Sequence, residues 1–206
     1  TAAGGVRSPR LLRAVDRLVK WIYRNCSRVL VQSRAFVPEI ARHGVPDSRI
    51  LYFPSWGESL FQPLQQADAS LLPPLPEGFK VLFAGNIGEA QDLPAVLKAA
   101  ELLRDRTDIQ WLIVGDGRMA AWAKEEVQRR GLSQVHFLGR HPLEAMPHFY
   151  AAADVLLLPL KREPIFALTI PGKLQSYLAC ARPILAMLDG EGARIVQESG
   201  AGLACP

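Results

Sequence analysis

The hydrophobic residues follow two patterns that alternate along most of the chain. From residue 80 onward, short runs in which every position is apolar, such as 81–83 and 155–158, are separated by longer stretches with helical periodicity. Uniformly apolar runs are typical of strands buried on both faces, and the longer stretches are typical of amphipathic helices. The pattern therefore predicts strands at 80–84, 109–114, 135–138, 154–158, 183–187 and from 201, and helices at 92–104, 118–130, 143–152, 171–181 and 191–199.

Strands and helices that alternate in this way are joined by right-handed crossovers, which predicts an α/β fold with a Rossmann-like, doubly wound parallel sheet. Ahead of it, the five prolines in 54–78 favour an extended connection. We therefore divide the chain into three parts. Residues 1–62 are the end of one domain and the start of the interdomain connection, 63–78 are a Pro-rich linker, and 79–206 are a second domain.

The N-terminal part predicts a smaller set of elements. An amphipathic helix at 10–26 is followed by a strand at 29–31, a helix capped by Ser33 and stopped by Gly44, and a strand at 50–53. This order is that of a single β-α-β unit.

The net charge of +4 comes from one end of the chain. Residues 1–34 carry eight Lys and Arg, Arg7 among them, against one Asp, whereas the other 172 residues carry 16 basic and 19 acidic groups. A nucleic-acid-binding domain more often spreads a basic face over its whole fold, so we expect no nucleic-acid partner. An apolar content of 49% argues against disorder, and no uncharged run reaches the ~18–20 residues of a membrane span.

The cysteines and the chain ends suggest where the protein works. Cys26, Cys180 and Cys205 lack the spacing of a disulfide framework or a zinc site, and we interpret them as reduced thiols, mostly packing residues, in a cytoplasmic protein. The chain opens at Thr1 without an initiator Met and closes in a starting strand, so we expect both ends to be cut from a longer protein.

Helix 10–26 has an apolar face opposite a basic ridge, with Trp21 beside the ridge. Two interpretations stay open: the apolar face packs on its own domain, or the helix docks on an anionic membrane surface. The apolar face comprises Leu11, Leu12, Val15, Leu18, Val19, Ile22 and Tyr23, and the ridge comprises Arg10, Arg13, Arg17, Lys20 and Arg24.

Candidate binding loops follow the strands, because ligands of doubly wound sheets bind beyond the C-terminal strand ends. Gly85-Asn86-Ile87-Gly88 could bring backbone amides to a phosphate, although a tight strand-exit turn is the simpler alternative. Gly115-Asp116-Gly117 has the same two interpretations. Arg140 and His141 follow the next strand, where they add a positively charged guanidinium group and an imidazole.

The segment 159–173 gathers the most charge. Lys161, Arg162, Glu163 and Lys173 surround the entry to one helix. Lysine is disfavoured in a first helical turn, which a bound anion would explain, while a plain surface cluster is the alternative.

Several segments of the chain share the order and spacing of motifs in a known family: 81–88, 112–117, 135–140, 151–159 and 171–184, together with Glu163 and 33–57. They resemble the C-terminal half of retaining, GT-B-fold glycosyltransferases of family four, the glycosyl transferases group 1, and 33–57 resembles the end of the family's N-terminal domain. The resemblance covers about residues 28–206 and is closest to the branch that builds bacterial surface polysaccharides.

The resemblance implies that 79–206 is a donor-binding domain, truncated at its C-terminus, and that 1–62 is the tail of an acceptor domain. It implies transfer of a sugar, an N-acetylated amino sugar in this branch, from a UDP-sugar to a lipid-linked or saccharide acceptor, by a hexosyltransferase-type enzyme with retention. No cofactor or metal is implied. The fragment alone is expected to be inactive. The enzyme is expected in the cytoplasm or peripherally on the inner face of the cytoplasmic membrane.

The resemblance also assigns roles to residues. Gly85, Asn86 and Gly88, with the amides of Leu168, Thr169 and Gly172, would hold the diphosphate; the backbone of Arg140 and His141 would hold the base. Glu163 would contact the donor sugar, and Lys161 or Lys173 would neutralise the leaving diphosphate. Where the family often has Arg and Lys, this chain has Asn86 and Gln91, and Ser176 replaces a Glu near the ribose. We therefore assign the binding of the diphosphate and the ribose to Lys161, Arg162, Lys173 and Gln175.

Two alternatives belong to other classes. An enzyme resembling UDP-N-acetylglucosamine epimerase would share the two-domain architecture, but the sequence lacks an obvious carboxylate and histidine set for proton abstraction. A non-catalytic nucleotide-binding domain would need only the loops described above.

Overall fold

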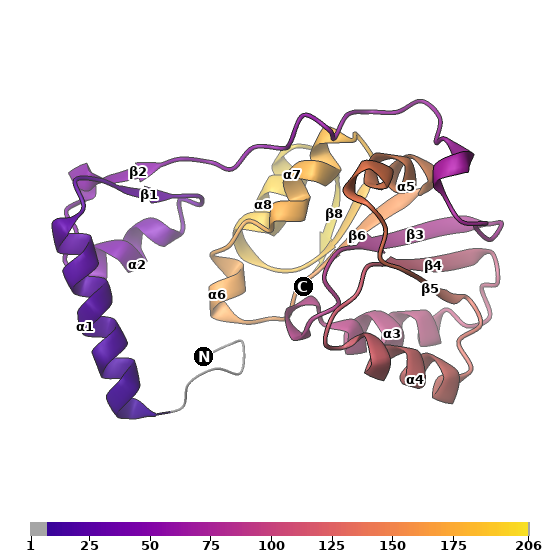
Figure 1. Cartoon of the computed structure of the whole chain (residues 1–206), viewed down its shortest axis with the longest axis horizontal. Coiled ribbons are helices and arrows are strands. Elements are labelled where there is room, and N and C mark those ends of the chain that lie inside the picture. The colour runs from indigo at the N-terminus through magenta and orange to yellow at the C-terminus, as the bar shows by residue number, and fades with distance from the viewer. Residues whose placement is uncertain (1–7, 206) are drawn as a thin grey trace.

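The computed structural model describes residues 8–205, so Arg7 of the basic stretch lies outside the described residues. The N-terminal unit contains α1 (Pro9–Asn25), β1 (Val29–Val31), α2 (Phe36–Arg42) and β2 (Ile50–Tyr52), with a 3-10 turn at Asp47–Arg49 (Figure 1). The two strands pair in parallel, with Val29 opposite Ile50. The predicted β-α-β unit is thus present.

Ser33 does not cap α2 as the sequence predicts. The helix begins at Phe36 with Ala35 in the capping position. The buried Ser33 hydroxyl instead accepts a hydrogen bond from the Ala35 amide at 3.2 Å and donates one to Glu191 Oε2 at 3.3 Å. Since Glu191 belongs to a helix near the C-terminus, Ser33 links the two parts of the chain.

A connecting segment, residues 53–78, joins the two parts without an α-helix or strand. It contains a short 3-10 helix at Ala69–Leu71. In Figure 1 the segment runs over the second unit. Phe61 is buried there in the main core, which fixes the middle of the segment to the unit that follows.

The second unit is built on one six-stranded sheet in which every neighbouring pair is parallel. The strand order is β5-β4-β3-β6-β7-β8, which confirms the predicted doubly wound sheet. The order reverses between β3 and β6, and such a switch point opens a crevice at the C-terminal strand ends. The strands are β3 (Phe79–Ala84), β4 (Ile109–Val114), β5 (Val135–Gly139), β6 (Val155–Pro159), β7 (Ile184–Met187) and β8 (Gly202–Cys205).

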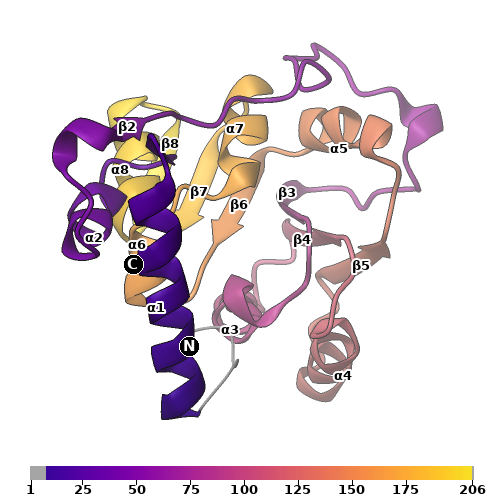
Figure 2. The same cartoon turned by 60° about the vertical axis from the view of Figure 1, so that its left-hand side comes forward.

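Side chains of β3 alternate between two hydrophobic clusters, one on each face of the sheet. Val81 and Phe83 belong to the cluster under α3 (Leu93–Leu102) and α4 (Ala120–Arg130). Leu82 and Ala84 belong to the cluster under α5 (Met146–Ala152), α7 (Gly172–Ala179) and α8 (Gly190–Glu198). Figures 1 and 2 show the sheet between these helices. Burial on both faces explains why the strand sequences are uniformly apolar.

The structure refines the predicted helices near the C-terminus. The helix predicted at 171–181 is shorter, and a separate four-residue helix, α6 (Pro164–Ala167), precedes it. Pro164 begins α6 and Pro171 stands immediately before α7, as expected for a residue whose ring suits the start of a helix. Short 3-10 turns also lie at Glu89–Gln91 and Leu143–Ala145.

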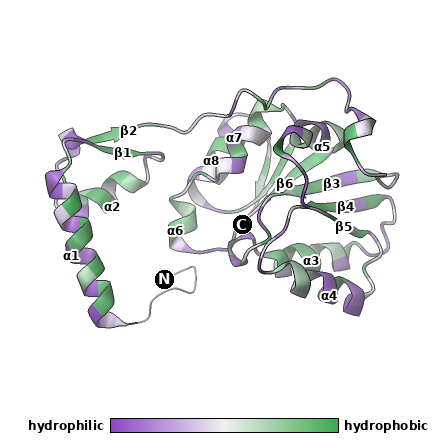
Figure 3. Cartoon of the chain, in the orientation of Figure 1, coloured by the Kyte–Doolittle hydropathy of each residue, from purple (hydrophilic) through white to green (hydrophobic). Residues whose placement is uncertain are grey.

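Helix α1 extends beyond the rest of its unit (Figures 1 and 2). Of its predicted apolar face, Tyr23 packs with α2 on the small core of Val31, Val45 and Ile50. Most of the face is exposed: Leu18 to 55%, for example, and the adjacent Trp21 to 63%. Figure 3 shows hydrophobic and hydrophilic residues alternating along this helix. Within 8–205, no helix combines the length and the apolar character that a membrane crossing requires.

Candidate functional site

A cavity of about 730 Å³ lies at the C-terminal ends of β3, β4 and β5, where it is closed by α5, the start of α7 and the connecting segment. Its position is the one expected for a ligand site in a doubly wound sheet. The lining residues are Glu58, Phe61, Ala84, Gly85, Asn86, Val114, Gly115, Asp116, Gly117, Arg140, His141, Leu143, Met146, Tyr150, Gly172, Lys173 and Ser176.

Glycines let the loops after β3 and β4 approach one another closely. Gly115 has φ +130°, and a Cβ there would lie 1.9 Å from the carbonyl oxygen of Gly85. The Gly85 amide donates to Val114 at 2.9 Å, and the Ile87 amide donates to Asp116 at 2.8 Å. The tight turns that the sequence allowed are therefore real, and they form the floor of the cavity.

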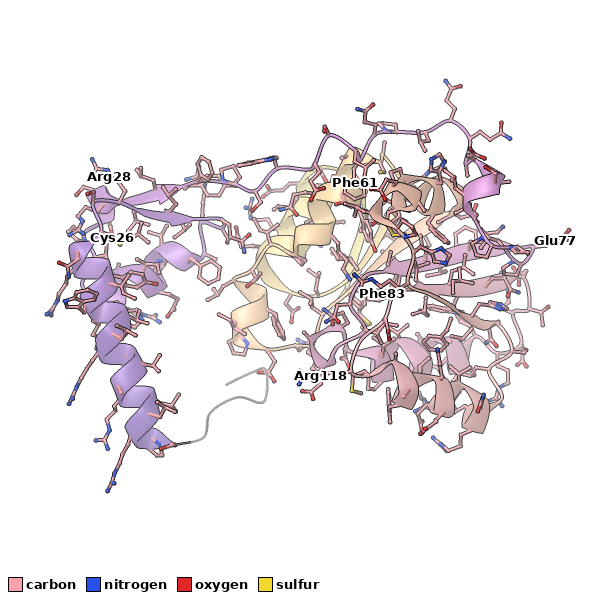
Figure 4. The ribbon with its side chains drawn as sticks, viewed as in Figure 1. Cys26, Arg28, Phe61, Glu77, Phe83 and Arg118 are labelled. Atoms are coloured by element: carbon pink, nitrogen blue, oxygen red, sulfur yellow. The ribbon has the colours of Figure 1, made fainter. Side chains whose placement is uncertain are left out.

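Lys173 is the one cation whose ammonium group is enclosed at this site within the described residues. Its Nζ is buried and has no hydrogen-bond partner there, and it lies 3.9 Å from the ring centroid of Phe83. Figure 4 labels Phe83 in the middle of the second unit. A Cβ on Gly85 would lie 3.0 Å from this Nζ, so the absence of a side chain at Gly85 leaves room for it. Burial lowers the pKa of Lys173 to about 7.

A buried ammonium group without an acceptor is costly, and this one faces a cavity with room for a ligand. An anion would supply both the missing acceptor and the opposite charge. Gly172 and Lys173 also begin an eight-residue helix, whose free amides favour anions. These observations agree that the end of the cavity near Lys173 and Gly85 suits a phosphate group.

Tyr177 holds the helix that carries Lys173. Its hydroxyl accepts a hydrogen bond from the Ala84 amide at 3.3 Å and donates one to the Leu157 carbonyl at 3.4 Å. It thereby bridges β3 and β6 at the switch point. Sequence reasoning missed this residue, although its spacing of four from Lys173 places both on one face of α7.

Six of the predicted site residues come together around the cavity: Gly85, Asn86, Arg140, His141, Gly172 and Lys173. His141 is held in place, since its Nε2 lies 3.0 Å from the Leu138 carbonyl oxygen and its ring packs edge-on against Phe149 at 4.7 Å. Arg140 is exposed at the rim.

The other predicted residues lie outside the lining. Arg162 pairs with Asp189 at 3.1 Å, and Thr169 donates to the Ile165 carbonyl at 2.8 Å. The Gln175 amide faces the carbonyl oxygens of Pro171 and Gly172, and the Gly88 amide donates to Gln91. Lys161 and Glu163 precede α6, and Leu168 follows it. Their roles stay predictions.

The connecting segment adds lining residues that the sequence did not predict. Glu58 and Phe61 reach the cavity, and Phe61 stacks on Tyr150 with ring centroids 5.8 Å apart. No local pattern marked these residues, because their position depends on contacts between distant parts of the chain. Among residues 8–205 no group of three or more His, Cys, Asp or Glu could hold a metal ion.

Comparison with known proteins identifies the family. Residues 78–206 match the model of the glycosyl transferases group 1. The chain belongs to this family. The resemblance predicted from its motifs is thus confirmed.

Two curated members of related sequence are glycosyltransferases by name. The chain is 32% identical to the probable glycosyltransferase WbjE of Pseudomonas aeruginosa over 204 residues, which is 96% of this chain and 49% of that protein. It is 34% identical to the putative colanic acid biosynthesis glycosyl transferase WcaI of Escherichia coli (strain K12) over 160 residues, 75% of this chain and 39% of that protein. The chain therefore spans about half the length of these relatives, or less.

Solved structures establish the fold of this group 1 chain. HepE of Anabaena, crystallised with UDP and glucose, superposes with a TM-score of 0.69 at 19% identity, over 96% of this chain and 55% of that one. Sucrose-phosphate synthase of Thermosynechococcus elongatus gives a TM-score of 0.71 at 22% identity, over 98% of this chain and 51% of that one. The predicted Rossmann-like half of a GT-B fold is confirmed.

Proposed function

We propose that this chain carries the donor site of a glycosyltransferase of polysaccharide biosynthesis. The donor is a UDP-sugar with an N-acetylated amino sugar, the acceptor is lipid-linked or a saccharide, and transfer is of the hexosyl type with retention. The observation that carries the proposal is the buried Nζ of Lys173, which faces the cavity without a hydrogen-bond partner among the described residues. Family membership and the names of WbjE and WcaI support the reaction class.

The chemistry of the donor fits this arrangement. When the bond between the anomeric carbon and the β-phosphate oxygen breaks, its electron pair stays on the diphosphate, where negative charge grows. A preorganised cation and helix amides in a partly dry site stabilise that charge best. Lys173 and the start of α7 provide them, so the proposal needs no metal and no cofactor.

We assign the remaining parts of the donor by their chemistry. The nucleobase lies beside Arg140 and His141, where Met146, Leu143 and Tyr150 offer apolar contact. Glu163, Lys161 and Arg162 belong to the segment that leads into α7, and we assign them to the sugar and the outer phosphate. Their place between β6 and α7, the helix that carries Lys173, supports this assignment.

Isothermal titration calorimetry with UDP tests the donor site. We expect UDP to bind the wild type and Lys173→Ala to weaken binding by roughly tenfold or more, since a charge-assisted contact is lost. Lys98→Ala is the matched control, because Lys98 is an exposed lysine paired with Glu101 on α3, away from the cavity. No binding of UDP, or equal effects of both variants, would overturn the proposal.

Two further nucleotides and a product assay separate the alternatives. Tighter binding of GDP or ADP than of UDP would show that the donor carries guanine or adenine in place of uracil. Release of an epimerised UDP-sugar would favour the epimerase alternative, and tight binding with no turnover in the full-length protein would favour a binding domain.

We further propose that α1 docks on an anionic membrane, which would suit a lipid-linked acceptor. Its exposed apolar side chains and the adjacent Trp21 support this, together with its basic ridge. Each basic residue near such a surface is worth about 1 kcal/mol. Arg17 and Arg24 are exposed, whereas Lys20 pairs with Asp16 at 2.8 Å.

Co-sedimentation with vesicles tests this docking. We expect binding to vesicles that contain phosphatidylserine and little binding to phosphatidylcholine vesicles. Arg17→Ala/Arg24→Ala should weaken the former by roughly thirtyfold, the equivalent of about 2 kcal/mol. Lys98→Ala/Arg104→Ala is the control, because it also removes two exposed basic residues, here from the second unit. Equal binding to both kinds of vesicle would reject the proposal.

A further inference from the structure

We propose that Glu58, from the connecting segment, binds the ribose hydroxyls of the nucleotide and makes the cavity specific for a ribonucleotide. The inference rests on the proposed function, because it takes a nucleoside diphosphate to be the ligand. It concerns a residue that lies outside the sheet and its loops. Glu58 lines the cavity together with Phe61 and Ser176.

The segment that carries Glu58 is held against the second unit on both sides of the residue. A Cβ on Gly57 would lie 3.4 Å from the Gln175 carbonyl oxygen and 3.4 Å from the Ala179 Cβ, so the backbone rests directly on α7. Three residues after Glu58, the ring of Phe61 is buried against Tyr150. The Phe61 amide donates to the Glu58 carbonyl at 3.0 Å, which closes a turn between these two anchors. The position of Glu58 at the cavity is thereby fixed.

The Glu58 carboxylate is available to a ligand. No ion pair or side-chain hydrogen bond occupies it among residues 8–205, in contrast to Glu101, Glu126 and Glu191, which pair with Arg or Lys. An ionised carboxylate accepts hydrogen bonds and donates none, and its two oxygens can accept from two neighbouring hydroxyl groups. A ribose diol offers that pair of donors.

The charges along the cavity decide which part of a nucleotide can lie near Glu58. Lys173, with the helix start at Gly172, provides the anion site. A carboxylate repels phosphates, so a phosphate at Glu58 is disfavoured and a neutral polyol is favoured. Ser176 follows Lys173 by three residues on α7 and adds a hydroxyl to the lining between the helix and the connecting segment. A nucleoside diphosphate with its phosphates at Lys173 and its ribose toward Glu58 satisfies both ends.

Titration with three probes tests the inference: UDP, 2′-deoxy-UDP and inorganic pyrophosphate. In the wild type we expect UDP to bind at least tenfold more tightly than 2′-deoxy-UDP, because a site built to hydrogen-bond a hydroxyl discriminates against its loss. Glu58→Ala should weaken UDP to the level of 2′-deoxy-UDP and leave pyrophosphate binding unchanged within about twofold. Glu58→Gln, which keeps the size and one acceptor, should give an intermediate ratio.

Glu77→Ala is the matched control. Glu77 belongs to the same connecting segment but lies two residues before β3, at the N-terminal end of that strand, whereas the cavity lies at its C-terminal end. Figure 4 shows Glu77 at the edge of the second unit, away from Phe83. It should leave the UDP to 2′-deoxy-UDP ratio unchanged. Thermal melting of each variant verifies the fold.

The outcomes separate the two proposals. If neither UDP nor pyrophosphate binds the wild type, the donor site is wrong and the role of Glu58 fails with it. If UDP binds and responds to Lys173→Ala, but the ratio is near one or survives in Glu58→Ala and Glu58→Gln, the donor site stands and the inference is overturned.

Discussion

The ammonium group of Lys173 lies 3.9 Å from the ring centroid of Phe83, near the C-terminal end of β3, which borders the cavity. The aromatic face compensates only part of the cost of burying a charge, and no carboxylate neutralises it within the described residues. The result is a pKa lowered to about 7 by burial, so that the group changes charge in the physiological range. Both the affinity of the site and the stability of the fold should depend on this residue.

The affinity for UDP should fall as the pH rises through the upper neutral range. A bound diphosphate favours the charged form of Lys173, so above pH 7 the free protein must take up a proton when the ligand binds. The Kd should then rise by up to about tenfold per pH unit between pH 7.5 and 9.5. Calorimetry in buffers of different ionisation enthalpy measures the proton uptake.

Lys173→Met is the control for this pH dependence. It should bind UDP weakly and with a Kd that does not change over the same range. A wild-type affinity that stays constant from pH 7.5 to 9.5 would contradict the role of Lys173.

The same substitution should stabilise the fold. An unfolded lysine has a pKa of about 10.4, so between pH 7 and 10 the unfolded state binds more protons than the folded state. The stability of the wild type should therefore rise with pH across this window. At pH 7 Lys173→Met should raise the free energy of unfolding by about 1–4 kcal/mol, an advantage that shrinks toward pH 10. Urea denaturation at both pH values measures it, and a less stable Lys173→Met at pH 7 would count against a buried charge.

Gly115 should tolerate no side chain. In Gly115→Ala the new Cβ would meet the Gly85 carbonyl oxygen at 1.9 Å in a backbone conformation that only glycine adopts readily. We expect a loss of roughly 3–5 kcal/mol in unfolding free energy, as for other backbone clashes and special conformations. Gly131→Ala is matched, because Gly131 also has a positive φ but nothing within 4 Å. It should lose only about 1–2 kcal/mol. Equal losses in urea denaturation would show that the loops can move apart.

The sequence predicts the sheet well because each strand is buried on both sides. Val81, Leu82 and Phe83 must all be apolar when alternate side chains enter two different clusters. The strand order also follows from general rules of handedness and connection. The end of α2 at Arg42 agrees with Gly44 as its stop, but its start does not agree with Ser33, whose partner Glu191 is 158 positions away.

The cavity is predictable to the extent that it depends on strand ends. Gly85, Arg140 and Lys173 meet because parallel strands bring their C-terminal ends to one edge. Glu58 could not be predicted, since its place depends on how the connecting segment packs on Tyr150 and α7. The segment before α7 shows a similar dependence on distant contacts: Arg162 is close to Lys173 in sequence, but it pairs with Asp189 at 3.1 Å and does not line the cavity. Its role toward the donor stays a prediction.

Tyr177→Phe should separate the packing of α7 from its hydrogen bonds. The Tyr177 hydroxyl is buried between the Ala84 amide and the Leu157 carbonyl. Its removal leaves both groups without this partner and should cost about 1–3 kcal/mol of unfolding free energy. Tyr150→Phe is the control, since its ring lies 5.1 Å from that of Tyr177 while its hydroxyl makes no hydrogen bond within 8–205. Equal stability of the two variants in urea would contradict the bridging role.

Glu163→Gln should distinguish the sugar end of the donor from the nucleotide end. Glu163 is exposed and lies outside the cavity lining, so the affinity for UDP should stay within about twofold of the wild type. If Glu163 contacts the sugar, as proposed, the variant should bind UDP-N-acetylglucosamine several-fold more weakly than the wild type does. Lys173→Ala should weaken both ligands, because both carry the diphosphate. Titration of the two ligands into the three proteins gives the comparison, and a Glu163→Gln variant with unchanged affinity for both would remove Glu163 from the donor site.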